Sequence, residues 1–376
     1  MKRIAFPILI LLAVLFIPQG FSYLTSDALA KKYEGMGLKE AMYYEKLDDK
    51  QVRCMLCPRR CVIPNRRRGF CKVRENRNGT LYTVVYAKPC AVHIDPIEKK
   101  PLFHVLPGTK SYSIATAGCN LACKFCQNWQ ISQAYPEELD SEELLPLQVV
   151  NYARMNNCPT IAYTYTEPTV FYEYMIDTAK IAHEKGVMNV MHSAGFINEE
   201  PLRELCKYMD AANIDLKGSD KFYDKFCFGR REDVLRTLKI LKEEGVWVEI
   251  TYLMIPTVND DEEYIRKTAK WIRENLGQDV PFHISRFWPT YKMKNLSPTP
   301  IEALKSARKI AMEEGLNYVY VGNAPGNKGE ITYCPKCKND IIERMGYNIF
   351  EYNLKDGKCK YCGEKIAGIW KKQIKL

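Results

Sequence analysis

The 376-residue sequence lacks internal repeats and low-complexity linkers, which argues against a solenoid and against a string of tethered modules. It also lacks the low hydrophobic content of a disordered chain, because 46% of its residues are hydrophobic. A chain of this length can bury a full-sized core. We therefore expect one large domain with smaller attachments.

A long transmembrane run is missing as well. The apolar stretch at residues 4–17 follows Lys2 and Arg3, and it is short for a spanning helix unless it extends to Leu24. It has the parts of a secretory signal but no twin-arginine pair, and its positive flank favours a cytoplasmic N-terminus. We interpret residues 1–24 as a hydrophobic targeting or anchor segment, with a misassigned start as the alternative.

The cysteines are distributed unevenly. Of fifteen, four fall in residues 54–71, three in 119–126 and four in 334–362. Clusters of the C-x2-C type are typical of metal ligands, whereas this pattern does not suggest a disulfide framework. The remaining four stand alone, and we expect them to be buried as small hydrophobic side chains: Cys90, Cys158, Cys206 and Cys227.

The central group is the most informative. Cys119, Cys123 and Cys126 have the spacing C-x3-C-x2-C, and Phe125 precedes the third. Three thiolates can hold three irons of a [4Fe-4S] cluster and leave the fourth iron free to bind a small molecule. The alternative is a set of structural cysteines or a zinc knuckle. The position of the triad after a predicted strand favours the cluster.

From residue 111 onward, short apolar runs alternate with amphipathic helical patterns. The predicted strands are Ser111–Thr116, Thr160–Tyr163, Val187–His192, Ala211–Leu216, Val246–Leu253, Phe282–Arg286 and Tyr318–Val321. The intervening helical patterns include Pro168–Glu184, Arg231–Glu244, Asp260–Asn275 and Pro300–Glu314. Such alternation implies a parallel sheet. We expect an α/β fold with a partial, TIM-like (β/α)6 barrel at residues 111–326 and its chemistry at the carboxyl ends of the strands.

Two outer cysteine blocks flank this region. The N-terminal extension, residues 25–110, carries Cys54, Cys57, Cys61 and Cys71, which could hold a second [4Fe-4S] cluster or a zinc ion; the sequence favours neither. The C-terminal module, residues 331–370, carries two C-x2-C pairs typical of a zinc ribbon or rubredoxin: Cys334, Cys337, Cys359 and Cys362. Zinc is the favoured metal there.

Two further segments lie before the first predicted strand. Residues 25–50 have the pattern of a helical lead-in. Residues 92–109 are polar and contain Asp95, Glu98, Lys99 and His104. We expect this second segment to be a loop, either at the surface or over the mouth of the barrel.

Several short motifs resemble one known family. These are CMLCPRRC, DPIEKKPLFH, CNLACKFCQN, YTYTEP, HSAGF, DLKG and the terminal ribbon. Together, over about residues 37–370, they resemble the AmmeMemoRadiSam-system radical SAM enzymes, relatives of pyruvate formate-lyase activating enzyme. The resemblance implies an oxidoreductase that reductively cleaves S-adenosylmethionine to a 5′-deoxyadenosyl radical for hydrogen abstraction.

The resemblance also implies cofactor contacts at the ends of the predicted strands: Phe125, Thr166, Glu167, Ser193, Asp215, Lys217 and His283. Two of these roles have structural alternatives. Glu167 could instead serve as an acidic residue at a helix N-terminus, and Asp215 could simply pair with Lys217. His192 could contact the cofactor or substrate, or it could be a buried histidine.

The implied partners are S-adenosylmethionine, an electron donor such as ferredoxin or flavodoxin, and a protein or small-molecule substrate. This chemistry implies a location in the cytoplasm or at the cytoplasmic face of the membrane, in tension with an export signal. Two other functions stay open. A radical SAM RNA-modifying enzyme would use the basic run at residues 59–77, although nucleic-acid binding is the less favoured reading of the +10 net charge. A membrane-tethered electron-transfer protein would need four ligands per cluster, which the triad lacks.

Overall fold

The structure is a computed structural model that describes residues 38–324, 326 and 328–371. The hydrophobic segment at residues 1–24 therefore lies outside the described residues. Residues 37–376 form one unit of the chain. Within the described residues, no helix combines the length and the apolar character needed to cross a membrane.

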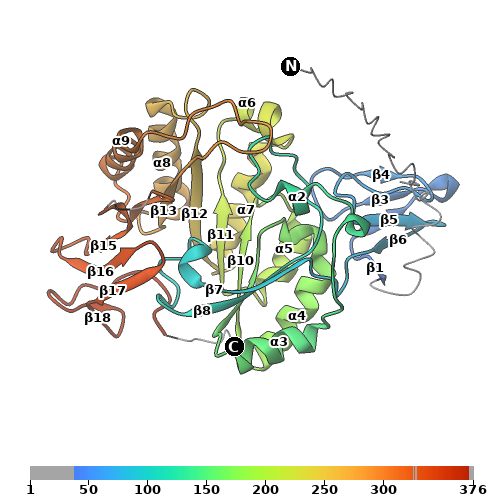
Figure 1. Ribbon diagram of the computed structural model, residues 1–376, viewed down its shortest axis with the longest axis horizontal. Coiled ribbons are helices and arrows are strands. Elements are labelled where there is room, and N and C mark those ends of the chain that lie inside the picture. Colours follow the sequence, from blue (N-terminus) through green and yellow to red (C-terminus); the bar gives the residue numbers. More distant parts are fainter. Residues whose placement is uncertain (1–37, 325, 327, 372–376) are drawn as a thin grey trace, which may run out of the picture. The chain divides into compact units, whose positions relative to one another are not determined.

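An eight-stranded mixed sheet forms the centre of the fold (Figure 1). Its order is β14-β13-β12-β11-β10-β9-β8-β7; β7 pairs antiparallel with β8, and all other neighbours are parallel. The bounds are β7 Ala91–Pro96, β8 Lys110–Ala115, β9 Thr160–Tyr163, β10 Met188–Ser193, β11 Ala211–Asp215, β12 Trp247–Met254, β13 Phe282–Arg286 and β14 Val319–Gly322. The seven predicted strands are confirmed to within about one residue at each end, and the α/β class with them. Closure into a partial barrel stays a prediction.

Helices occupy the crossovers between the parallel strands. They are α2 Trp129–Ser132, α3 Pro146–Met155, α4 Tyr172–Glu184, α5 Glu199–Cys206, α6 Asp220–Phe222, α7 Arg231–Glu243, α8 Glu262–Leu276 and α9 Ile301–Glu313, with a short 3-10 turn, η4 Pro168–Phe171, before α4. In α8 the buried residues Ile265, Ala269, Ile272 and Leu276 recur every three or four positions and so form one apolar face. The Asp261 side chain caps that helix by accepting from the Tyr264 amide at 2.8 Å.

The segment between β7 and β8 lies at the opposite end of the sheet from where we expected it. Glu249, near the start of β12, accepts from the Phe103 and His104 amides at 3.0 and 2.8 Å. Asn213 in β11 donates to the Pro101 carbonyl at 2.7 Å. Glu98 and His104 are buried. The prediction of a surface loop or a cover over the barrel mouth is therefore wrong: residues 91–96 form a strand, and residues 97–106 pack toward the amino ends of the strands.

The N-terminal extension contains two small antiparallel sheets, β1-β6-β5 and β2-β3-β4. Their strands are β1 Lys39–Glu40, β2 Tyr44–Lys46, β3 Val52–Cys54, β4 Val62–Ile63, β5 Arg74–Arg77 and β6 Thr80–Thr83, with a 3-10 turn, η1, at Asp48–Lys50. A helical lead-in is therefore wrong for residues 38–50. The buried Arg74 ties this extension to α4 by an ion pair with Glu173 at 2.7 Å.

The C-terminal module is built of short antiparallel strands: β15 Thr332–Tyr333, β16 Asp340–Met345, β17 Asn348–Tyr352, β18 Leu354–Lys355 and β19 Lys358–Cys359. A 3-10 turn, η6 Lys328–Glu330, leads into it. Its buried Cys334 and Ile341 pack with Phe103, Tyr318 and Tyr320 of the central domain. The module is thus docked on the sheet through a shared apolar cluster.

Candidate functional site

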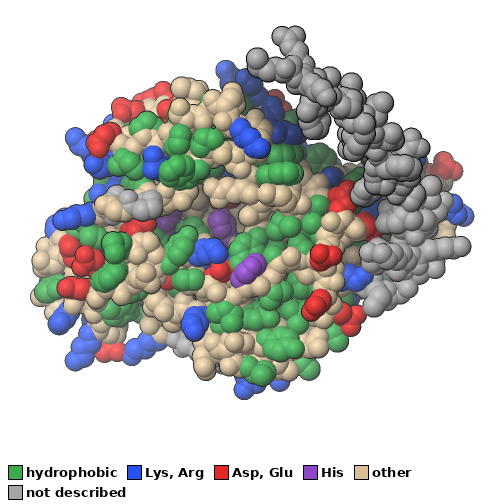
Figure 2. Space-filling model, viewed as in Figure 1, with side chains coloured by type: hydrophobic (Ala, Val, Ile, Leu, Met, Phe, Trp, Pro, Cys, Tyr) green, Lys and Arg blue, Asp and Glu red, His purple; other side chains and the backbone are tan. Residues whose placement is uncertain are grey.

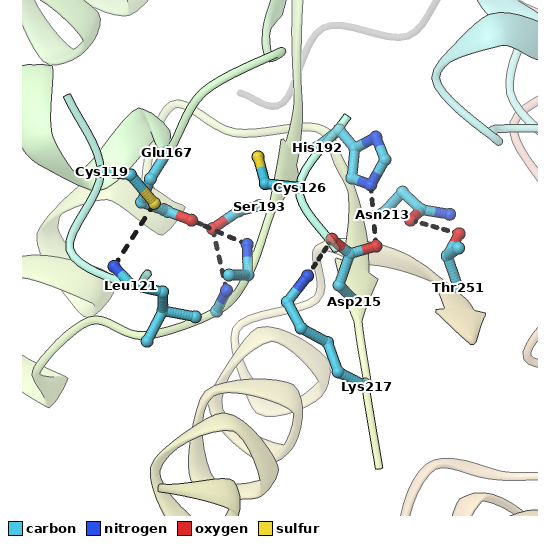
Figure 3. A network of polar contacts seen from close by, with 12 residues as sticks. Cys119, Leu121, Cys126, Glu167, His192, Ser193, Asn213, Asp215, Lys217 and Thr251 are labelled. Carbon is cyan, nitrogen blue, oxygen red and sulfur yellow. Dashed lines mark hydrogen bonds and ion pairs between the residues drawn. The ribbon is translucent and has the colours of Figure 1, made fainter. Parts of the chain in front are cut away.

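The cysteine triad lies in the loop that leaves the carboxyl end of β8 and enters α2. The Leu121 amide donates to the Cys119 sulfur at 3.4 Å (Figure 3). The Cys126 sulfur lies 3.3 Å from the Ser132 hydroxyl oxygen. Burial raises the pKa of the Cys119 and Cys126 thiols. The loop therefore presents protein-enclosed sulfurs beside the ends of the next strands.

Cys227 is a neighbour of the triad that the sequence did not reveal. It ends a π-helical turn, η5 Tyr223–Cys227, and its carbonyl accepts from the Ala122 amide at 3.1 Å. A hydrogen bond with Cys227, together with the nearby Lys217 ammonium, lowers the pKa of the Cys123 thiol. A single cysteine about one hundred residues away carries no spacing signal, so only the fold could bring it here.

The triad fits a multi-iron cluster better than a single ion. Among the described residues, the C-terminal cysteines are the only group of three or more metal-ligating side chains whose donor atoms all lie within 4.8 Å of one another. The triad is more widely spaced, and its donors are three soft thiols. Thiolates on separate irons of one cluster stand farther apart than thiolates on one ion, so this donor set suits a [4Fe-4S] cluster.

Glu167 joins the carboxyl ends of β9 and β10. Its carboxylate accepts from the Thr169 hydroxyl and the Ser193 hydroxyl, each at 2.7 Å, and from the Ala194 amide at 2.8 Å. It also caps η4 by accepting from the Thr169 amide at 3.1 Å. The capping alternative is thus realised. A further role toward a cofactor ammonium stays a prediction, because the buried carboxylate already has these partners.

Asp215 lies between the side chains of Lys217 and His192 at the end of β11 (Figure 3). Its Oδ2 is 2.6 Å from the Lys217 ammonium, and its Oδ1 is 3.0 Å from Nε2 of His192 on β10. These two neighbours hold the pKa of Asp215 well below its usual range despite its burial. The carboxylate also raises the pKa of Lys217. The pair that the sequence left as an alternative is present, and it lies beside the Cys123 thiol.

Two other predicted contact residues lie near this end of the sheet. The Phe125 ring packs on Phe222, with centroids 5.5 Å apart, and its centroid is 6.0 Å from the Lys217 nitrogen. The Thr166 hydroxyl donates to the Thr116 carbonyl at 2.9 Å. Phe125 and Lys217 therefore share one wall of the site, while Thr166 braces the strand that leads into the cysteine loop.

His283 does not lie at the rim, and the prediction that placed it there is wrong. It is the second residue of β13, at the amino end of the strand. Its Nε2 is 2.6 Å from the Glu249 carboxylate, and its ring meets Phe103 edge-on at 4.8 Å between centroids. A strand residue so close to the amino end cannot reach the carboxyl-end rim. We therefore leave His283 out of the cofactor site.

The four N-terminal cysteines line one common cavity. Cys54, Cys57, Cys61 and Cys71 share it with Arg59, Arg74 and Asn120, among others. Arg59 also donates to the backbone carbonyls of Asn120 and Phe228. Because Asn120 belongs to the triad loop, the two cysteine groups are neighbours in the fold.

The four C-terminal cysteines converge much more closely. Cys334 and Cys362 are 3.6 Å apart at sulfur, and Cys337 and Cys359 are 3.7 Å apart. A hydrogen bond from the Asn339 amide, together with its neighbouring thiols, lowers the pKa of Cys337 to about 6. These four sulfurs can enclose one metal ion and leave it no open position.

Comparison with known proteins gives one family match and several relatives. Residues 113–272 match the radical SAM superfamily. The uncharacterized protein MJ0808 of Methanocaldococcus jannaschii is 51% identical over 331 residues, which cover 88% of this chain and 99% of that protein. The pyruvate formate-lyase-activating enzyme of Clostridium pasteurianum is 26% identical over 52% of this chain and 87% of that enzyme. A solved domain of pyruvate-formate lyase-activating enzyme from Bacteroides vulgatus has a TM-score of 0.39 at 20% identity and covers 43% of this chain and 98% of that domain.

Proposed function

Because this chain belongs to the radical SAM superfamily, we propose that it cleaves S-adenosylmethionine reductively and uses the 5′-deoxyadenosyl radical to abstract hydrogen from a second substrate. The observation that carries the proposal is the placement of the three-thiol loop beside the Asp215–Lys217 pair at one end of the sheet. When bound there, a [4Fe-4S] cluster supplies the open iron and the electron for this cleavage.

The side chains around the loop have complementary tasks. Lys217 offers a charged donor for the carboxylate of the methionine moiety, and Asp215 offers two acceptor oxygens for ribose hydroxyls. Glu167 and Ser193 fix the turn at the ends of β9 and β10, where the ammonium would lie. Phe125 covers the Lys217 side and limits the entry of water. These residues position the cofactor, and the reacting group is the nucleoside radical itself.

The second substrate is proposed by analogy. Activating enzymes such as the Clostridium pasteurianum relative are named for acting on another enzyme, so we propose a protein substrate for this chain too, with a glycine as the target. A ferredoxin or flavodoxin would supply the electron. The identity of 26% covers about half of the chain, so the cofactor chemistry is better supported than the substrate.

The test is 5′-deoxyadenosine formation under anaerobic conditions. Reconstituted protein, reduced with dithionite and given S-adenosylmethionine, should release 5′-deoxyadenosine, and Cys126→Ala should abolish it. Cys126 is a better choice than Cys123, because Cys227 lies beside Cys123 and could replace its sulfur. Cys158→Ala is the matched control, since Cys158 is a buried cysteine outside the three groups. Turnover retained in Cys126→Ala would refute the proposal.

A further inference from the structure

The N-terminal cysteines are a second group of neighbouring thiols that are packed less closely than the four C-terminal thiols. Cys54, Cys57, Cys61 and Cys71 line one cavity, yet they do not form a close donor group of the kind that the four C-terminal cysteines form. We propose that these four residues bind a second [4Fe-4S] cluster, and not a zinc ion, and that this cluster passes single electrons to the cluster of the triad.

The first argument is the spacing of the sulfur atoms, which can be compared among the three cysteine groups of this chain. Zn–S bonds of about 2.3 Å in a tetrahedron place the sulfurs roughly 3.8 Å apart. The C-terminal cysteines meet this requirement, with sulfur pairs at 3.6 and 3.7 Å. The triad does not, and neither does the N-terminal set. A cube that carries each thiolate on a different iron needs the wider arrangement. The N-terminal set therefore resembles the cluster-binding triad and differs from the zinc-type site.

The lining of the cavity is the second argument. Leu56, Ile63 and Val170 supply an apolar wall, and Arg59 and Arg74 supply positive charge. Arg74 is 2% exposed, and its Nε is a buried donor without a hydrogen-bond partner in the described part of the chain. A buried N–H left unpaired is costly, so a bound acceptor is expected there. The sulfurs of a cluster provide that acceptor, and such hydrogen bonds help to set its potential.

The third argument is the contact between the two cysteine groups. A Cβ added at Gly118, the residue before Cys119, would lie 2.5 Å from the Cys71 carbonyl oxygen. The backbone of the triad loop therefore passes directly against the backbone of an N-terminal ligand. Arg59 and Asn120, which both line the N-terminal cavity, join the two groups by a hydrogen bond from side chain to carbonyl.

This contact defines a one-electron path. An external one-electron donor of low potential reduces the N-terminal cluster, which is oxidised again when it passes the electron to the cluster of the triad. Each sulfonium cleavage consumes one such electron, and no proton transfer is needed at the N-terminal site. The assignment goes beyond the proposed function, because the triad alone suffices for cofactor cleavage with a chemical reductant.

Metal analysis of the full chain tests the proposal. After anaerobic reconstitution with iron, sulfide and zinc, we expect about eight irons and one zinc per chain for two four-iron clusters and one closed zinc site. A variant with Cys119, Cys123 and Cys126 all changed to Ala should keep about four irons and, after dithionite, the electron paramagnetic resonance signal of one reduced [4Fe-4S] cluster. A triad variant that holds a second zinc, or no metal beyond the ribbon zinc, would overturn the assignment.

A reciprocal variant completes the experiment. Cys57→Ser with Cys61→Ser should lose about four irons and keep the cluster of the triad, while Cys90→Ser, outside all three groups, should lose none. If the reciprocal variant does not fold, the iron and zinc contents of the wild type and the triad variant still test the assignment. Wild type with about four irons and two zincs that forms 5′-deoxyadenosine refutes this inference and leaves the proposed function standing. Wild type with about eight irons and no 5′-deoxyadenosine refutes the proposed function alone.

Discussion

Asp215 shows how single residues prepare the site for a charged cofactor. It lies between the Lys217 ammonium at 2.6 Å and the His192 ring at 3.0 Å, and both keep its carboxyl group ionised. The Tyr223 hydroxyl donates to the Asp215 carbonyl at 3.2 Å and accepts from the Lys217 amide at 3.1 Å, which fixes the backbone between the two. The charges are thus positioned before any ligand arrives.

We predict that Lys217→Ala weakens S-adenosylmethionine binding by about 1.5–3 kcal/mol, or roughly 10- to 150-fold, the scale of one charged hydrogen bond. Binding should be measured on the cluster-loaded protein, with the iron content shown to be unchanged. Lys221→Ala is the matched control, because Lys221 is exposed on the neighbouring α6. Unchanged affinity in Lys217→Ala with an intact cluster would show that β11 does not hold the cofactor.

At the residue scale, the sequence predicts which residues lie at the end of a strand. It does not predict which residues from distant parts of the chain contact them. Asp215, Lys217 and Ser193 were predicted because their motifs, DLKG and HSAGF, resemble those of a known family and follow predicted strands of a parallel sheet. Cys227 was not, because its place beside Cys123 depends on the π-helical turn after β11. His283 was misplaced because a motif gives a strand but not the position along it.

At the scale of elements, burial explains which strands could be predicted. Strands β8 to β14 are buried along most of their length, as expected for parallel strands covered on both faces, and each carries a core of apolar residues. Strand β7 is an edge strand that exposes Val92 and Ile94 and carries polar residues, so it has no such signature. The strands of the N-terminal extension are two to four residues long and depend on tertiary pairing that sequence periodicity cannot reveal.

A buried ion pair connects β5 to α4, and we expect its loss to lower the free energy of unfolding. Arg74 Nη2 lies 2.9 and 2.7 Å from the two carboxylate oxygens of Glu173, and the side chains are 2% and 0% exposed. We predict that Glu173→Gln lowers the free energy of unfolding by about 3–5 kcal/mol, because it leaves the Arg74 charge buried without its partner. The urea midpoint of the metal-loaded protein measures this change.

Glu302→Gln is the control for that experiment. Glu302 pairs with Lys305 at 2.7 Å, but both side chains are well exposed, so its loss should change stability by about 0–1 kcal/mol. Equal urea midpoints for Glu173→Gln and Glu302→Gln would contradict the stabilising role predicted for the buried ion pair between Arg74 and Glu173.

His104 couples the docking of the C-terminal module to pH. Its Nδ1 is 2.6 Å from the Ala367 carbonyl, which can only accept, so that nitrogen carries the proton; Nε2, 2.6 Å from the Tyr320 hydroxyl, accepts. Burial lowers the pKa of His104 to about 4. Since the unfolded value is about 6.5, its neutral form contributes stability above that pH, and this contribution is lost as the pH falls toward the folded value.

We therefore predict that stability falls by about 3 kcal/mol between pH 6.5 and 4 from this residue alone. His104→Asn should show a shallower decline in thermal midpoint over the same range. The four C-terminal thiols are present in both proteins, so the difference between the two curves isolates His104. Parallel curves would contradict the prediction.

At the scale of the whole molecule, the charge does not point to nucleic acid. The net charge is +10, but much of the basic run at residues 59–77 has partners inside the protein. Arg74 pairs with Glu173, Arg68 with Glu75 and Glu137, and Arg77 with Glu75. On the face shown in Figure 2, basic and acidic side chains are interspersed. Arg60, Arg66 and Arg67 are exposed, so the run keeps only part of the basic surface that suggested an RNA-modifying role.

We expect the C-terminal module to unfold without unfolding the rest of the protein. Its four closely spaced sulfurs stand in for a core that about 40 residues cannot provide on their own. We predict that Cys359→Ser loses about one zinc per chain and becomes sensitive to protease within residues 331–371. Iron content and 5′-deoxyadenosine formation should survive, because the shared apolar cluster with Phe103 and Tyr320 belongs to the amino ends of the strands, away from the triad.

Metal analysis and limited proteolysis of the same preparation check both halves of this prediction. Lys360→Ser is the matched control, since it changes the next residue, which is exposed and is not a ligand. If Cys359→Ser lost its iron together with its zinc, the module would be needed for assembly of the active site. If the variant kept a protease-resistant ribbon without zinc, the apolar cluster alone would hold the module, and the metal would have no structural role.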